Sequence, residues 1–137
     1  MWESREETLL LSIQNKCDRQ ASRHETTGYR KKRLYALFGI PTTIIPLVTA
    51  SLTQMKGVDT LIITCLMLVV GILTGVNTFF NFGKQRQSHF EFAGKYQELS
   101  LEIGVELCKP KKNRIACDVF LERMSSKFNQ LNNNAPT

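Results

Sequence analysis

Two stretches of the chain, residues 34–55 and 60–83, carry no charged side chain over 22 and 24 residues. As helices they would be roughly 33 and 36 Å long, and the hydrocarbon core of a bilayer is about 30 Å thick. Neither stretch has the charged stripe at helical spacing that is typical of a soluble bundle, the alternative interpretation. The pattern therefore predicts an all-α integral membrane protein with a two-helix transmembrane hairpin at 34–83 and a turn at 56–59.

The two predicted spans differ in polarity. The second is strongly apolar, whereas the first contains several hydroxyl and amide side chains, namely Thr42, Thr43, Thr49, Ser51, Thr53 and Gln54. Pro41 and Pro46 are expected near the start of the first span, where proline would kink or loosen the helix.

Amphipathic segments flank the spans. Residues 3–33 predict a juxtamembrane helix, with apolar positions at Leu9, Leu10, Ile13, Cys17 and Ala21. Residues 84–131 predict a cytosolic helical region with one stripe at Phe92, Tyr96, Leu99, Ile103 and Leu107, and a second at Phe120, Met124, Phe128 and Leu131. We expect Pro110 to end the first of these helices, Asp118 to cap the second, and 132–137 to be disordered. The three stripes should pack on one another or on other subunits.

Basic residues cluster beside the spans and give the chain a net charge of +6. Positive residues resist translocation and attract anionic headgroups, so both termini are expected on the cytoplasmic side. The residues assigned to this role are Arg30, Lys31, Lys32, Arg33, Lys84 and Arg86. A second basic turn is interpreted as a solvated loop or a site for a partner or headgroups, rather than for nucleic acid, and comprises Lys109, Lys111, Lys112 and Arg114.

The sequence offers little for catalysis. It has no glycine-rich phosphate loop and no nucleophile or zinc motif. His24 and His89 are far apart in sequence, and the four cysteines form no Cys-x-x-Cys pair. We therefore expect a non-enzymatic protein with no cofactor and no metal, whose thiols are free.

Small and weakly polar residues recur at helical spacing in both spans. One face holds Thr42, Pro46, Thr49 and Thr53, and the other holds Gly71, Thr74, Gly75, Thr78 and Asn81. Such faces let helices approach closely and hydrogen-bond across the contact. They could meet inside one hairpin, or face a subunit interface or a water-filled centre, and we favour packing over a pore lining.

Three stretches together resemble the SLATT superfamily of two-helix membrane proteins, particularly short stand-alone forms like those of large DNA viruses. They are "HETTGYRKKRLYALFGIP", the glycine-containing second span, and "GKYQELSLEIGVELCKPKKNRIACDVFLERMSSKFNQL". The resemblance implies a membrane hairpin with cytosolic helices and homo-oligomers, and bacterial members are thought to act as pore-forming effectors. A viral member would occupy a host membrane or a virion internal membrane.

Two functional hypotheses follow. The favoured one is a membrane protein that oligomerises through its hairpin and forms a pore or perturbs the bilayer. The alternative is a structural anchor that links a lipid bilayer to a scaffold or capsid protein. A soluble helical protein that binds nucleic acid is a distant third possibility.

Overall fold

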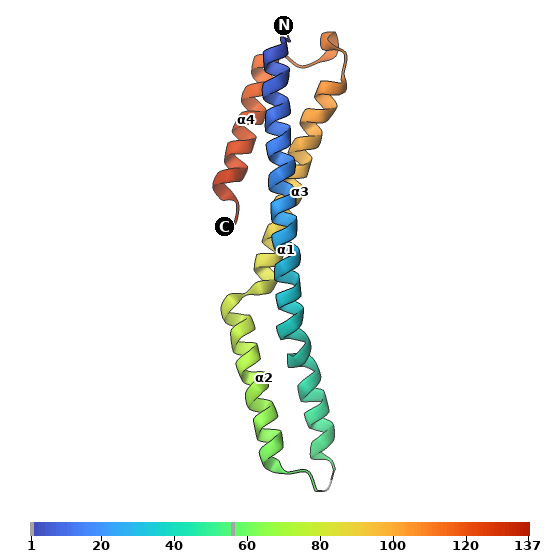
Figure 1. The fold of residues 1–137 in the computed structure, drawn as a ribbon, viewed down its shortest axis with the longest axis vertical. Helices are drawn as coiled ribbons and strands as arrows, with labels where there is room; N and C mark the ends of the chain where they lie inside the picture. Colours follow the sequence, from blue (N-terminus) through green and yellow to red (C-terminus); the bar gives the residue numbers. More distant parts are fainter. Residues whose placement is uncertain (1, 56) are drawn as a thin grey trace. The chain divides into compact units, whose positions relative to one another are not determined.

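The computed structural model describes residues 2–55 and 57–137, so Lys56 of the predicted turn lies outside the described residues. The helices are α1 (Ser4–Thr53), α2 (Thr60–Phe80), α3 (Phe82–Cys108), the short 3-10 helix η1 (Lys111–Asn113) and α4 (Cys117–Asn134), as Figure 1 shows. No strand occurs among the described residues, which confirms the prediction of an all-α fold.

Helix α1 is longer than either segment predicted for this region. Its 50 residues, Ser4–Thr53, include nearly all of the predicted juxtamembrane segment, 3–33, and of the first apolar stretch, 34–55, and Pro41 and Pro46 lie inside it without ending it. The hydroxyls of Thr42 and Thr43 donate to the carbonyl of Gly39 at 2.7 and 3.1 Å. Polar groups beside the prolines are thus bonded within the helix.

The chain divides into two compact units. Unit 1 comprises the chain up to Gly28 and from Gln87 onwards, and unit 2 comprises Tyr29–Arg86. Helices α1 and α3 each contribute residues to both units.

Unit 1 is a bundle of α1, α3 and α4 around one apolar core. The most deeply buried large side chains come from all three helices and are Leu10, Cys17, Tyr96, Ile103, Phe120 and Met124. They belong to the three predicted stripes, so the prediction that these stripes pack on one another is confirmed. Leu9 is an exception, because it is 47% exposed.

Both ends of α4 differ from the prediction. The N-cap is Ala116, which has no side-chain cap, and not Asp118 as predicted. Asp118 lies in the first turn, where its carboxylate interacts favourably with the helix dipole. The helix continues to Asn134, three residues into the segment predicted to be disordered. The hydroxyl of Tyr96 donates to Oδ1 of Asn132 at 2.7 Å, and this bond ties the end of α4 to α3.

Removal of this hydroxyl should weaken unit 1 measurably. We expect Tyr96→Phe to lower the free energy of unfolding by about 0.5 to 1.5 kcal/mol, because one hydrogen bond is lost while the ring packing stays. Trp2 is buried in the same core and is the single tryptophan of the chain, so its fluorescence in urea reports the change. Unchanged stability would show that the bond contributes nothing to the end of α4.

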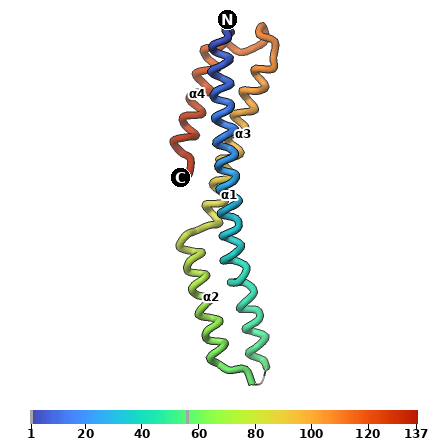
Figure 2. The backbone as a smooth tube through the Cα atoms, viewed as in Figure 1, coloured from blue at the N-terminus to red at the C-terminus, as the bar shows by residue number. Residues whose placement is uncertain are grey.

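Unit 2 pairs the second part of α1 with α2, which runs back beside it, as Figure 2 shows. Asp59 caps the start of α2 and accepts a hydrogen bond from the backbone N–H of Leu61 at 3.0 Å. Asn81 ends the helix in the left-handed conformation with φ of 49°, and its N–H donates to the carbonyl of Asn77 at 2.9 Å. Asparagine tolerates this conformation better than most residues. The second apolar helix therefore ends at Phe80 rather than at residue 83, and Asn81 is a cap rather than a residue of the small-residue face.

Candidate functional site

Unit 2 contains apolar helices that the protein itself leaves uncovered. In the second apolar run, which begins at Thr60, an 18-residue window has a mean hydropathy of 2.2, and none of it is buried. The corresponding window of α1 has a mean hydropathy of 1.6 and is 6% buried. Leu61, Leu68 and Phe79 expose 69%, 65% and 84% of their surface. A core helix of a soluble protein would be mostly buried, whereas these two helices are long and apolar enough to cross a membrane.

The face that α2 turns toward α1 is built from large aliphatic side chains. The half-buried positions are Ile63, Leu66, Val70, Leu73, Val76 and Asn77. Five of them, spaced three and four residues apart, form one stripe along the helix. This stripe, rather than the glycines, makes the contact within unit 2.

The glycine face of α2 is open. A Cβ atom added at Gly71 or Gly75 would meet no atom within 4 Å, and Thr74 and Thr78 are exposed. At about 100° per residue, Gly71 and Gly75 lie roughly 140° and 180° around the helix from the middle of the α1-facing stripe. We define Gly71, Thr74, Gly75 and Thr78 as the glycine face.

The small residues of α1, unlike those of α2, lie mostly on the inner side of unit 2. Thr49 is buried, Thr42 and Pro46 are half-buried, and Thr53 is exposed. The structure thus turns much of one predicted face inward and the other outward, and it does not bring the two faces together.

The hydroxyls of these helices are bonded locally. Thr49 donates to the carbonyl of Ile45 at 2.8 Å, and Thr53 donates to that of Ala50 at 2.7 Å. Thr64 of α2 likewise donates to the carbonyl of Thr60 at 2.9 Å. These donors serve their own helices rather than bonds between α1 and α2.

An aromatic cluster closes the end of unit 2 where α2 meets α3. The ring of Phe82 stacks on Phe38 and Phe80, with centroids 5.8 and 5.4 Å apart. Lys31 lies 5.7 Å above the ring of Phe82, and Arg86 lies 5.3 Å above that of Tyr35. We call Tyr35, Phe38, Phe80 and Phe82 the aromatic cluster.

The predicted headgroup residues therefore fall into two groups. Lys31 and Arg86 cover aromatic rings, whereas Arg30, Lys32, Arg33 and Lys84 are exposed. The sequence interpretation missed the aromatic cluster, although aromatic residues at the end of an apolar run are themselves a sign of a membrane interface.

The basic turn of unit 1 is largely engaged in internal contacts. The Arg114 side chain is 9% exposed, donates to Glu7 and to the carbonyl of Leu107 at 2.6 Å each, and lies 5.2 Å from the ring of Trp2. The hydrogen bond that Arg114 donates to Glu7 lowers the pKa of the Glu7 carboxyl. The guanidinium of Arg114 is therefore engaged within unit 1, and the prediction that the turn binds a partner is left to its lysines.

The three lysines of this turn are more accessible. Lys109 pairs with Glu106 at 2.7 Å, and Lys111 lies 3.4 Å from Glu7. The hydrogen bond from Lys109 and that from the backbone of Ile115 lower the pKa of Glu106. Lys112 is exposed.

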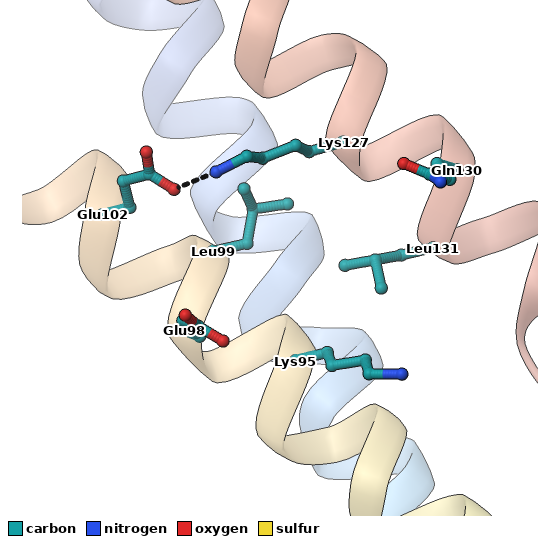
Figure 3. A pocket seen from close by; sticks show the side chains of 7 residues that line it. All are labelled: Lys95, Glu98, Leu99, Glu102, Lys127, Gln130 and Leu131. Atoms are coloured by element: carbon teal, nitrogen blue, oxygen red, sulfur yellow. Dashed lines mark hydrogen bonds and ion pairs between the residues drawn. The ribbon is translucent and has the colours of Figure 1, made fainter.

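A small groove of about 190 Å³ lies between α3 and α4 in unit 1. Figure 3 shows Lys127 reaching from α4 to Glu102 of α3, with Leu99 and Leu131 between the helices. Glu102 accepts from Lys127 at 2.7 Å and also from Arg123. Burial alone would raise the pKa of Glu102, but these two cations lower it. The charges of the groove thus stabilise the contact between α3 and α4.

Sequence distance misled the interpretation of the histidines. The structure brings His24 and His89 into direct contact, with their Nδ1 atoms 3.0 Å apart. No group of three metal-ligating side chains occurs among the residues that the structure describes. Cys17 and Cys117 are buried, and burial raises the pKa of each thiol to about 11, whereas Cys65 and Cys108 are exposed.

Comparisons with protein-family models, curated proteins and solved structures find no match.

Proposed function

We propose that the protein is a non-enzymatic integral membrane protein whose unit 2 crosses a bilayer as a helical hairpin. The observation that carries this proposal is the apolar run from Thr60, which has a mean hydropathy of 2.2 in a window with no buried residue. The aromatic cluster, together with exposed Arg30, Lys32 and Lys84, has the composition of a membrane–water interface with anionic headgroups. In this arrangement both termini lie on the cytoplasmic side of the membrane. If the protein is viral, that membrane is a host membrane or an internal membrane of the virion.

Copies of the protein associate through the glycine face of α2. This face is open, whereas the aliphatic stripe of the same helix is turned to α1. In lipid there is no hydrophobic driving force between helices, so close backbone approach at small residues becomes a main source of association. Gly71 and Gly75 are separated by the spacing that permits such an approach.

Enlarging the glycine face should break the oligomer. We expect Gly71→Leu with Gly75→Leu to convert oligomers to monomers in mild detergent, as measured by native mass spectrometry or cross-linking. Cys65→Leu is the matched control, because Cys65 is exposed on the same helix but lies roughly 100° around it from the glycines. If the glycine variant keeps the wild-type oligomer, association through this face is excluded.

The same oligomer forms a pore or perturbs the bilayer, as the SLATT resemblance implies. Purified protein in liposomes should then release a trapped dye, and the glycine variant should release less. A stable wild-type oligomer that releases neither ions nor dye would contradict the pore but leave the membrane hairpin intact.

Local bonding of the hydroxyls favours a second candidate function. Thr49, Thr53 and Thr64 donate within their own helices, which leaves fewer donors to line an aqueous path. In this alternative the hairpin is an anchor, and unit 1 binds a scaffold or capsid protein or anionic headgroups through its exposed lysines.

The anchor function predicts a charge-dependent partner contact. Lys111→Gln with Lys112→Gln should reduce the cross-linked partners of unit 1 without changing membrane insertion. Lys16→Gln, at an exposed position of α1 in the same unit, is the control. An identical set of partners for all three proteins would count against this role of the turn.

A further inference from the structure

The two histidines of the chain meet inside unit 1, away from the features used in the proposed function. His24 of α1 and His89 of α3 are 65 residues apart in sequence, and they are 9% and 4% exposed. The ring of His24 also stacks on Tyr96, with centroids 5.7 Å apart and an angle of 11°. The pair therefore joins α1 to α3 through directly facing Nδ1 atoms.

The contact limits how many protons the pair can hold. A hydrogen bond between two Nδ1 atoms requires that one carries the proton and the other offers its lone pair. A first extra proton can bind an Nε2 atom and leave this bond in place. A second must bind the accepting Nδ1, and two N–H groups on two cations would then face each other across 3.0 Å.

Groups of both charge signs lie beside the pair. A pocket of about 520 Å³ beside the pair is lined on α1 by Arg23 and on α3 by Tyr96, and α4 with the chain after it adds Asn132, Pro136 and the last residue of the structure, Thr137, with its terminal carboxylate. No carboxylate side chain lines this pocket among the described residues. The open pocket gives protons a path to the pair, and the direct contact of the two Nδ1 atoms, rather than the charge of the lining, limits the pair to one extra proton.

We propose that the His24–His89 contact is a pH-sensitive latch, which holds α1 against α3 at neutral pH and opens when the pair takes up its second proton. Burial lowers the pKa of His24 from its ordinary value of 6.5. As the pH falls below about 6.5, the unfolded chain therefore binds protons before the folded pair does, and the stability of unit 1 decreases. The decrease ends once the folded pair is itself protonated.

The pH window separates this effect from that of the carboxylates. Glu7, Glu102 and Glu106 have pKa values below their ordinary value of 4.5, so the stability that they contribute is lost only in stronger acid. The chain has two histidines in all, and both belong to the latch. A change between pH 7.5 and 5.5 therefore reports the pair.

The test measures urea unfolding of the full-length protein in mild detergent with EDTA, followed by Trp2 fluorescence at pH 7.5 and 5.5. We expect the unfolding constant of the wild type to rise about tenfold at the lower pH, which is the effect of one histidine that stays neutral in the folded state. His24→Asn with His89→Asn keeps a donor and an acceptor near the Nδ1 positions but does not titrate, so its unfolding constant should change by less than about twofold. Equal pH dependence in both proteins would overturn the proposal.

A second measurement needs no variant. In the wild type labelled with ¹⁵N-histidine, the two rings should titrate in separate steps, and the second step should coincide with faster amide exchange around His24 and His89. A single step near pH 6.5 for both rings, without a change in amide exchange, would equally overturn the latch.

Discussion

Leu68→Arg is expected to keep α2 out of the membrane and to move the carboxyl terminus to the far side. Leu68 lies near the middle of α2 and is 65% exposed. Replacing leucine by arginine at the centre of a spanning helix costs about 3 to 4 kcal/mol in apparent insertion free energy. Without α2 in the bilayer, the chain crosses only once.

A glycosylation acceptor appended after Thr137 reports this change in microsomes. We expect the wild type to remain unmodified and Leu68→Arg to be glycosylated in a large fraction of molecules. The matched control is Leu101→Arg, because Leu101 is a leucine of α3 with a nearly equal exposure of 68%, but it belongs to unit 1. If the two arginine variants behave alike, the insertion of α2 is not what this assay detects.

Arg114→Met is expected to destabilise unit 1 by about 2 to 3 kcal/mol, because its charged donors to two backbone carbonyls are lost. In the folded protein the guanidinium donates to the carbonyls of Leu107 and Lys109 at 2.6 and 2.8 Å. Methionine retains a long side chain beside Trp2 but supplies no donor. Urea unfolding followed by Trp2 fluorescence measures the loss.

Lys112→Met is the control for this change, because Lys112 is exposed in the same turn, and a surface substitution there should stay within about 0.5 kcal/mol. The comparison also has a pH dependence. Arg114 lowers the pKa of Glu7 below its ordinary 4.5, so this contribution is present above pH 4.5 and is lost as the pH falls through the lowered value. The difference in free energy of unfolding between the wild type and Arg114→Met should therefore become smaller in acid. Similar losses for Arg114→Met and Lys112→Met would contradict the structural role of Arg114.

Local pattern was enough to predict that the chain is helical and which residues form the core of unit 1. The two apolar helical stretches can be recognised in the sequence because no charged residue occurs over 34–55 and 60–83. Spacing of three and four residues likewise predicted that Leu99, Ile103 and Phe120 would be buried.

Contacts between distant residues could not be predicted in this way. His24 meets His89 across 65 residues and Arg114 meets Glu7 across 107, and neither pair leaves a periodic trace in the sequence. The direction of the glycine face is a related case. Helical spacing shows that Gly71 and Gly75 share a side, but only packing decides that aliphatic residues such as Val70 and Leu73 turn toward α1 instead.

In the proposed arrangement, α2 and the second part of α1 lie in hydrocarbon. Spin labels at Leu68 and Leu101 of the full-length protein in lipid nanodiscs test it most directly, since both leucines are similarly exposed in the structure. Oxygen concentrates in the bilayer, whereas a water-soluble nickel chelate stays outside. We predict that the label at position 68 collides often with oxygen and rarely with nickel, and that the label at position 101 shows the reverse. Free access of the nickel chelate to position 68 would contradict the claim.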